Sequence, residues 1–503
     1  MSRDCCSWDG VICDNMTGNV IELNLSCSGI VGKIDSNSNL FQLSHLQRLD
    51  LSYLTHFFGS HISPEFGRFS NLTYFDLSWA GFSGQIPSEV SHLSKLHSLR
   101  LYGCSCVRIV AHDFKLLLQN SIQLRKLDLS NINISSTIPL NFSSHLTTSS
   151  LKNTGLYGII PESIFHLPNL EILYLSFNDF RGYFPKTKWN SSASLVELDL
   201  LGVNFYDSFA KSVGYLTSVR YLSLQTGNLR GPIPESISNL TCIDYLHLQE
   251  NSLNGTIPAG VFSLHNNGSS LINLNLHSNK LEGRIPRSLA NCKELQLLHL
   301  GDNHLTDTFL IWLGTLPKLK VLILRSNSLH GSIQPPRIET IFPKLQILDF
   351  SDNAFSGNLP SNLFQRLEET SFRERYQNNW FLLCLSFLNL SHNHLQGCIP
   401  QRPQFLTFES NLYEGNNRLH GFPISKNCGD ARALNKNNGL QDDEESDSDF
   451  KSDFWKADFL GYGSGLCIGL SIIYLMISSG NPKWLARIIV EMENKIMMVR
   501  RKK

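Results

Sequence analysis

The chain has no net charge and carries no catalytic signature. Its 503 residues include 43 Lys and Arg against 43 Asp and Glu, so no basic surplus would draw the protein to nucleic acid. The sequence also contains no Gly-rich phosphate loop and no HRD-like segment of the kind that kinases use. We therefore predict that the protein is not an enzyme and binds no cofactor.

What the chain does contain is one sequence pattern, repeated along most of its length. The pattern is L-x-x-L-x-L-x-x-N-x-L-x-G-x-I-P, and it is clear in LQLLHLGDNHL from Leu295 and in LSFLNLSHNHLQGCIP from Leu385. A fixed period of this kind predicts a leucine-rich-repeat solenoid. Its leading apolar position recurs fifteen times, mostly 22 to 28 residues apart, at Val20, Leu46, Leu72, Leu96, Leu124, Leu146, Leu170, Leu195, Val219, Ile243, Leu271, Leu295, Leu319, Leu345 and Leu385.

Each repeat is predicted to contribute one short strand. Leucines that alternate in x-L-x-L-x lie on one face of a strand, and the intervening residues lie on the other. One unit cannot bury its leucines alone, so neighbouring units stack their strands into a parallel sheet. The expected fold class is an α/β-type leucine-rich-repeat solenoid with a parallel β-sheet on its concave face, an irregular or 3-10 convex side, and one transmembrane helix.

An asparagine follows most of these strands at the point where the chain must turn inward. A buried Asn amide can bond the backbone of adjacent coils, whose polar groups would otherwise lack partners. The Gly and Pro that come next are expected to bend the convex side. The asparagines are Asn178, Asn251, Asn279, Asn303, Asn327, Asn353 and Asn393.

The segment CCSWDGVIC, from Cys5 to Cys13, precedes the first repeat. A terminal repeat needs a cap over its open apolar end, and a disulfide-tied cap suits an oxidising compartment. We expect a bond between Cys6 and Cys13, with two reduced core cysteines as the alternative. Residues 1–4 contain no apolar run and so predict no signal peptide, and we expect the chain to begin inside its own cap. Cys398 and Cys428 flank the last coil and are expected to staple a C-terminal cap.

Sequons of the form Asn-x-Ser/Thr indicate an extracellular protein, although repeats rich in Asn, Ser and Thr also generate some by chance. Asn24 and Asn389 lie inside predicted strands, and we expect both to be poor acceptors. The predicted glycosylation sites are Asn15, Asn71, Asn133, Asn141, Asn190, Asn239, Asn254 and Asn267.

The leucine frame ends after Cys428, and a membrane segment is predicted beyond it. Residues 459–479 carry no charge, and as a helix they would span about 31 Å, which matches a hydrocarbon core. A buried soluble helix is the alternative. Basic residues are concentrated after this run, which places the tail in the cytosol and the repeats outside. Gly461, Gly465 and Gly469 recur every fourth residue, so they share one helix face and would let another helix approach closely.

The chain therefore divides into six predicted parts, and its tail is too short for a kinase domain. These parts are a partial N-terminal cap (1–19), a solenoid of about 15 repeats that is irregular at 361–384 (20–400), a C-terminal cap (401–430), an acidic juxtamembrane linker (431–458), a transmembrane helix (459–479) and a short basic cytosolic tail (480–503).

The strand residues between the leucines are expected to form the ligand-binding surface, since solenoids usually bind on the concave face. Aromatic residues and Arg are favoured at interface hot spots, although strands also favour aromatic residues for packing alone. The histidines among them lack the carboxylate or Cys spacing of a metal site. The predicted ligand-binding residues are Trp79, Arg100, Tyr102, Tyr174, Tyr221, Gln225, Tyr245, His247, Gln249, His277, His299 and Arg325.

Taken together, these features resemble plant leucine-rich-repeat receptor-like proteins of the disease-resistance type (the Cf and Verticillium-resistance kind). The resemblance rests on the CCSWDGVIC cap, the coils, the segment SNLYEGNNRLHGFPISKNC, the acidic run and the single span with its basic tail. It implies a single-pass type I receptor of the plasma membrane without a kinase domain, which recognises a pathogen- or self-derived protein or peptide. It also implies signalling in defence through adaptor and co-receptor kinases, held by Gly461, Gly465 and Gly469 and by the acids from Asp442 to Asp449.

The chain also departs from that family. Members carry a signal peptide, a full cap and a non-repeat island followed by about four repeats, where this chain has only residues 366–380 and one repeat. A truncated gene product or decayed paralogue is therefore one alternative. A secreted binding protein of the polygalacturonase-inhibitor kind is another, and the predicted span argues against it.

Overall fold

The computed structural model describes residues 4–54, 59–103, 107–140, 142–186, 188–189, 194–262, 270–333, 342–360, 385–401, 405–425 and 428. Contacts divide the chain into two units, Met1–Gly429 and Asp430–Lys503, and every described residue belongs to the first. The predicted linker, span and tail, with Gly461, Gly465 and Gly469, lie outside the described residues, as does the irregular stretch 361–384. Within the described ranges, no helix has the length and apolar character that crossing a membrane requires.

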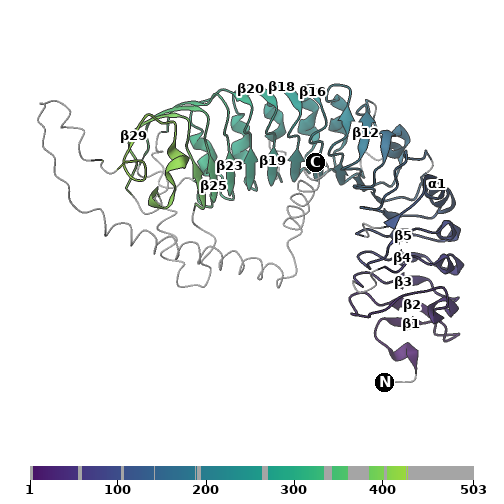
Figure 1. Ribbon diagram of the computed structural model, residues 1–503. Coiled ribbons are helices and arrows are strands. Elements are labelled where there is room, and N and C mark those ends of the chain that lie inside the picture. The colour runs from purple at the N-terminus through teal and green to yellow at the C-terminus, as the bar shows by residue number, and fades with distance from the viewer. Residues whose placement is uncertain are drawn as a thin grey trace, which may run out of the picture. The chain divides into compact units, whose positions relative to one another are not determined.

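One sheet of sixteen strands runs through the described part of the chain, and Figure 1 shows successive strands side by side in chain order. β1 (Val11–Cys13) belongs to the N-terminal cap and pairs antiparallel with β2 (Val20–Asn24). The later pairs are parallel up to β27 (Phe387–Asn389). Each of the fifteen predicted units contributes one of these strands, which confirms the solenoid and its parallel sheet.

The strands between β2 and β27 in this main sheet are β3 (Arg48–Asp50), β4 (Tyr74–Asp76), β6 (Ser98–Arg100), β8 (Lys126–Asp128), β9 (Thr148–Ser150), β11 (Ile172–Tyr174), β13 (Glu197–Asp199), β15 (Tyr221–Ser223), β17 (Tyr245–His247), β19 (Asn273–Asn275), β21 (Leu297–His299), β23 (Val321–Ile323) and β25 (Ile347–Asp349). The central residue of each faces the core, as Leu198, Leu246 and Leu298 illustrate by their burial. The residues on either side form the outer face of the sheet. The alternation predicted from x-L-x-L-x is therefore present.

β9 breaks this rule, because a serine occupies its core position. Ser149 is fully buried, and its hydroxyl has no hydrogen-bond partner among the described residues. The next residue, Ser150, lies on the outer face, where its hydroxyl is 2.6 Å from that of Ser130. Two adjacent serines thus have opposite hydrogen-bonding status.

We predict that Ser149→Ala raises the free energy of unfolding by about 1 kcal/mol, because the desolvated hydroxyl gains nothing in the folded state. Ser150→Ala is the matched control, and it should lower stability by about the same amount because it removes a hydrogen bond. Urea unfolding of the two variants measures both changes. A loss of stability in Ser149→Ala would show that its hydroxyl is bonded in solution.

The G-x-I-P part of the repeats forms short parallel strands, where the sequence predicted only a bend. Gly231 and Gly283 lie in such strands with φ of 77°, a left-handed value that glycine adopts without strain. The four additional sheets are β5 (Gly84–Gln85) with β7 (Val107–Arg108); β10 (Tyr157–Ile159), β12 (Asp179–Gly182) and β14 (Asn204–Phe205); β16 (Arg230–Pro232), β18 (Ser252–Thr256), β20 (Lys280–Gly283) and β22 (His304–Leu305); and β24 (His330–Ser332), β26 (Ala354–Asn358), β28 (His394–Cys398) and β29 (Arg418–His420).

Short 3-10 helices occur in most of the described coils, as expected for the side opposite the sheet. The α-helix α1 (Ala111–Asn120) was not predicted, and it buries Phe114, Leu117 and Leu118. The 3-10 helices are Cys5–Ser7, Asn39–Gln42, Pro64–Arg68, Ser88–His92, Glu162–His166, Lys211–Tyr215, Glu235–Asn239, Ala259–Phe262, Arg287–Asn291, Ile311–Thr315, Phe405–Thr407 and Ser410–Tyr413.

The asparagine ladder is confirmed at all seven predicted positions. Asn303 shows the pattern: its Nδ2 donates to the carbonyl oxygens of Leu276, Leu300 and Gly301 at 3.0 to 3.1 Å. Its Oδ1 accepts the N–H of Leu281 at 3.0 Å. The buried amide therefore ties each coil to the one before it. Asn416 continues the ladder by one further rung.

Disulfides close both ends of the described solenoid. Cys6 is bonded to Cys13 in the N-terminal cap, with a Cα separation of 5.6 Å. Cys398 is bonded to Cys428 beyond the last coil, with a Cα separation of 5.7 Å. Cys5, Cys27 and Cys242 are free cysteines of the described part of the chain. The two bonds therefore lie in the segments at the two ends of the described stack.

Candidate functional site

The outer face of the main sheet is built from rows of side chains that run across the coils. Parallel register places the last residues of successive strands side by side, as it does for His247, Asn275 and His299. Neighbouring strands are about 4.8 Å apart, so side chains from residues some 24 positions apart in sequence meet on this face. Two groups of such contacts stand out.

The first group, the N-terminal cluster, is organised around Tyr74. Its hydroxyl donates to Asp76 Oδ2 at 3.1 Å and lies 3.5 Å from Asp50 Oδ2. The guanidinium of Arg48 lies over its ring, 3.6 Å from the centroid, and that of Arg100 lies 3.6 Å from Asp76. Burial, followed by the charges of Asp76 and Asp50, raises the pKa of Tyr74. The phenol therefore stays protonated and donates between two carboxylates.

Three aromatic side chains extend this cluster. The hydroxyls of Tyr102 and Tyr53 are 3.3 Å apart, and the ring of Tyr102 meets that of Trp79 edge-on at 6.4 Å between centroids. Burial, followed by the interaction with Tyr53, raises the pKa of Tyr102. Tyr53 and Trp79 remain 48% and 46% exposed. Of the predicted binding residues, Trp79, Arg100 and Tyr102 thus lie together, while Arg48, Tyr53 and Tyr74 were missed.

The second group, the central cluster, begins with the rings of Tyr221, Tyr245 and His247. Tyr221 lies 6.2 Å from Tyr245 and 5.5 Å from His247 between ring centroids, and Tyr245 meets His247 edge-on at 6.4 Å. All three are half-buried. Tyr174, two coils earlier, donates its hydroxyl to Glu197 on the neighbouring strand.

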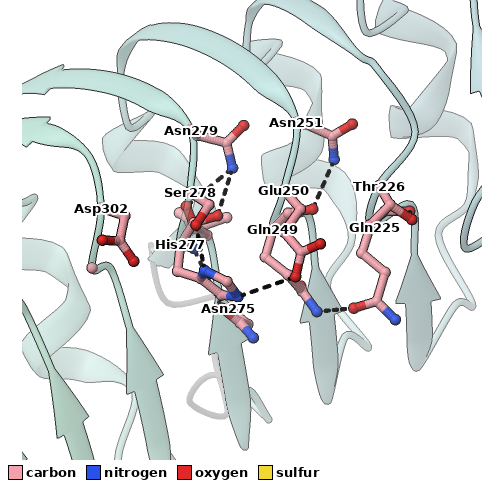
Figure 2. A network of polar contacts seen from close by, with 12 residues as sticks. Gln225, Thr226, Gln249, Glu250, Asn251, Asn275, His277, Ser278, Asn279 and Asp302 are labelled. Carbon is pink, nitrogen blue, oxygen red and sulfur yellow. Dashed lines mark hydrogen bonds and ion pairs between the residues drawn. The ribbon is translucent and has the colours of Figure 1, made fainter. Parts of the chain in front are cut away.

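The polar part of the central cluster follows in the next coils (Figure 2). The rings of His277 and His299 stack at 4.3 Å with an interplanar angle of 17°. His277 Nδ1 is 2.8 Å from Ser278 Oγ, and its Nε2 is 3.9 Å from Glu250 Oε1. Arg325 pairs with Asp302 at 3.1 Å. Predicted residues His277, His299 and Arg325 therefore belong to one charged and partly exposed surface.

Gln225 and Gln249 are more buried than the other residues predicted to contact ligand. They are 7% and 5% exposed, and Gln249 Nε2 donates to Gln225 Oε1, as Figure 2 shows. Each of the two residues lies two positions after the end of its strand, where the chain turns toward the asparagine ladder. We therefore assign them to the support of the surface rather than to the surface itself.

His299 gives the central cluster a pH dependence. Burial, followed by the nearby charges of His277 and Arg325, lowers the pKa of His299 to about 3. The unfolded chain, in which a histidine titrates near 6.5, therefore binds this proton more readily than the folded chain. The stability that neutral His299 contributes is present above pH 6.5 and is lost as the pH falls toward about 3.

We predict that His299→Gln flattens this pH dependence, which has a slope of at most about 1.4 kcal/mol per pH unit. Urea unfolding between about pH 4 and pH 7 measures the slope. The exposed His304 provides the control, since His304→Gln should leave the slope unchanged. Equal slopes in the parent and in His299→Gln would contradict the burial of a neutral imidazole.

The described sequons differ in exposure. Asn71 is half-buried, and the exposed acceptors are Asn15, Asn133, Asn239 and Asn254. Asn141, Asn190 and Asn267 lie outside the described residues. The one close group of candidate metal ligands in the described part is Cys5, Cys6 and Cys13, and two of these share a disulfide.

Comparison with known proteins places this geometry in a family. Residues 105–396 match the family described as "Leucine-rich repeat region". A Cf-9 homolog receptor-like protein of Solanum lycopersicum is 34% identical over 795 residues, covering 100% of this chain and 93% of that protein. The chain belongs to the plant leucine-rich-repeat receptor-like proteins of the disease-resistance type. Because that alignment is longer than the chain, the relative contains segments without a counterpart here.

Other receptor-like proteins match over a smaller part of their length. Receptor-like protein 9DC1 of Solanum pimpinellifolium is 53% identical over 235 residues, which are 46% of this chain and 27% of that protein. In this match the chain spans about a quarter of its relative. Among solved structures, PEPR1–AtPEP1 is 25% identical with a TM-score of 0.58, covering 80% of this receptor-like chain and 63% of PEPR1.

Proposed function

We propose that this receptor-like protein recognises a pathogen- or self-derived protein or peptide through the central cluster of its main sheet. The observation that carries the proposal is the contact of Tyr221, Tyr245 and His247 across consecutive coils. Half-buried aromatic side chains held by their neighbours lose little entropy on binding, which is typical of interface hot spots. The PEPR1–AtPEP1 structure supports a protein or peptide as the ligand.

The charged part of the central cluster adds specificity to this surface. Arg325 forms an ion pair with Asp302, and His277 lies beside Glu250, with both contacts partly open to solvent. Such charges select a partner by complementarity and raise the association rate more than they raise affinity. We infer a ligand segment that places an apolar or aromatic side chain on Tyr221 and Tyr245 and a polar segment toward Arg325.

The proposed signalling route follows from the family and from the C-terminal sequence. Residues 459–479 would anchor the repeats outside the plasma membrane, and the resemblance to the family implies a receptor that has no kinase domain of its own. The signal would therefore pass to adaptor and co-receptor kinases of the same membrane. We propose that Gly461, Gly465 and Gly469 form the helix contact, with the acids from Asp442 to Asp449 beside it.

This route predicts that Gly465→Leu weakens the association with a receptor kinase by about tenfold or more, because a branched side chain separates the two helices. The full chain, expressed behind a secretory signal in leaf cells, is recovered through a tail tag, and the bound kinases are quantified by mass spectrometry. Gly463 lies off the shared helix face, so Gly463→Leu is the matched control. Equal recovery of kinases with both variants would overturn the proposed contact.

A further inference from the structure

The N-terminal end of the main sheet carries an asparagine whose side chain is open to modification. Asn24 begins the sequon Asn24-Leu25-Ser26 and ends β2, on the same outer face as Asp50, its partner in register. The side chain of Asn24 is exposed, whereas Asp50 is buried. On the other side of Asn24 lies Gly10, where an added Cβ would collide with the Asn24 carbonyl oxygen. Because Gly10 has no side chain, it does not cover Asn24 on this side.

Asn389 provides a comparison within the same chain. Both asparagines end a strand and accept hydrogen bonds at Oδ1 from the backbone and hydroxyl of the serine two residues later. Asn389, however, is half-buried, and the segment Ser410–Tyr413 packs against its strand, with Leu390 donating its N–H to Leu412. Their positions inside strands predicted both to be poor acceptors, but only Asn389 is covered.

Aromatic side chains surround the outer face beside Asn24. Tyr53 and Trp79 are both about half exposed, and they lie in the turns that follow β3 and β4. The indole of Trp79 lies against Gly103, where an added Cβ would come within 2.6 Å of the ring. Tyr102 completes this group through its contacts with Tyr53 and Trp79. We call these three rings the aromatic platform.

Two of the three residues of the aromatic platform stand at a left-handed turn position of the repeat. Tyr53 and Trp79 have φ of 58° and 55°, in the left-handed region that bulky residues avoid. The equivalent turn position also has positive φ in other coils, where residues as different as Asn131, Phe177 and Glu250 occupy it. The left-handed turn therefore belongs to the repeat, and what distinguishes this end of the sheet is that two large rings remain exposed there.

The chemistry of the platform fits a sugar. A pyranose ring presents a face of C–H groups and a rim of hydroxyls. The C–H face packs on flat aromatic rings, and the rim can bond the hydroxyls of Tyr53 and Tyr102 and the guanidinium of Arg100. Strands lie about 4.8 Å apart, so the coils of the platform begin one strand away from Asn24. A sugar attached to Asn24 is therefore within reach of it.

We propose that Asn24 carries an N-linked glycan whose first sugars lie on the aromatic platform. The donor is an oligosaccharide carried on a polyprenyl pyrophosphate. Asn24 Nδ2 forms a bond to C1 of its first sugar while the C1–O bond to phosphate breaks. The polyprenyl pyrophosphate leaves with the bonding pair, and the amide loses one proton to solvent.

The glycan restricts where the ligand can bind. It covers the N-terminal cluster, so Trp79, Arg100 and Tyr102 contact sugar instead of ligand, in place of the role predicted for them from sequence. Of the two clusters, only the central cluster then remains free to bind the ligand. This inference rests on the proposed function, because N-glycans are added only to segments that enter the secretory path.

Site-by-site occupancy tests the attachment. The full chain is expressed behind a secretory signal in plant cells, and intact glycopeptides are quantified by mass spectrometry. We expect Asn24 to be occupied in most copies and Asn389 at least about tenfold less often. An unoccupied Asn24 beside occupied Asn239 and Asn254 would overturn the inference and leave the proposed function standing. A chain with no occupied sequon would contradict the proposed function itself.

The rate of glycan release tests the platform. An endoglycosidase is added to the native protein, and release at Asn24 and at exposed Asn239 is followed in one sample. The double variant Tyr53→Ala, Trp79→Ala should accelerate release at Asn24 by about tenfold. It should leave release at Asn239 unchanged, and an unfolding temperature close to that of the parent shows that the variant is folded. Tyr215→Ala, at an exposed ring elsewhere, is the control. Unchanged release at Asn24 would overturn the role of the platform.

Discussion

Replacing Asn303 with alanine is expected to lower the free energy of unfolding by about 3 kcal/mol, because one buried amide satisfies four backbone groups. Its removal leaves the carbonyls of Leu276, Leu300 and Gly301 and the N–H of Leu281 without their partner. Each unsatisfied buried group costs about 1 to 3 kcal/mol, and local relaxation recovers part of the total. Urea unfolding measures the difference from the parent.

The neighbouring residue provides the control for this experiment. His304 is exposed, so His304→Ala should change stability by less than about 0.5 kcal/mol. Hydrogen exchange adds a local readout, since the coils on both sides of Asn303 should lose protection before the distant ones do. Equal stability of Asn303→Ala and His304→Ala would show that the ladder is dispensable at this coil.

Removing the C-terminal disulfide by the double substitution Cys398→Ser, Cys428→Ser is expected to cost about 3 to 4 kcal/mol. The bond closes a loop with a sequence separation of 30, and chain entropy in the unfolded state rises when it is lost. The loop contains buried Tyr413 and the ladder residue Asn416, which cover the last coil. We also expect the double variant to aggregate, because the apolar end of the stack becomes exposed.

Thermal unfolding under oxidising conditions measures the effect of this disulfide. Cys27 is a free and exposed thiol, so Cys27→Ser should unfold at the temperature of the parent. This control separates the loss of the staple from a general effect of removing sulfur. If the double variant unfolds at the parent's temperature, then the segment 401–428 does not stabilise the solenoid.

The sequence predicted those parts of the fold that depend on the repeat period. The fifteen strands and the seven asparagines share one frame, and the frame fixes both which residues face the core and which bond the neighbouring coil. Asn416 was missed because the segment YEGNNRLHG replaces the leading leucines, so the frame could not be recognised there. Its amide nevertheless makes the ladder bonds, since the coil geometry persists for one further turn.

The additional sheets and α1 could not be predicted from the pattern of a single repeat. A short strand such as β16 exists only because the next coil places β18 beside it, which is a non-local property. The coil with α1 is one of the longest, and its segment AHDFKLLLQN contains neither Gly nor Pro. These conditions allow a full helical turn to continue in place of a 3-10 turn.

For the candidate site, the sequence predicted which side chains lie on the outer face of the sheet. It did not predict how far neighbouring side chains bury each of them. Gln225 and His247 both follow core leucines, yet one is buried and the other half-exposed. Burial depends on neighbours about one repeat away. The N-terminal cluster was only partly predicted for the same reason, because Tyr74 becomes important through two aspartates on its own and the preceding strand. Once the parallel register of the strands is known, it places Tyr74 and Asp76 beside Arg48 and Asp50.

The central proposal is that the repeats lie outside the cell on a protein that spans the membrane once. Its most direct test is a topology measurement on the full chain, expressed behind a secretory signal in plant cells and detected with an antibody to residues 495–503. We predict a membrane-bound band whose mobility shifts when N-glycans are removed, and which external protease on intact cells cuts to a short fragment containing the tail. A soluble band that neither shifts nor is cut would contradict the account.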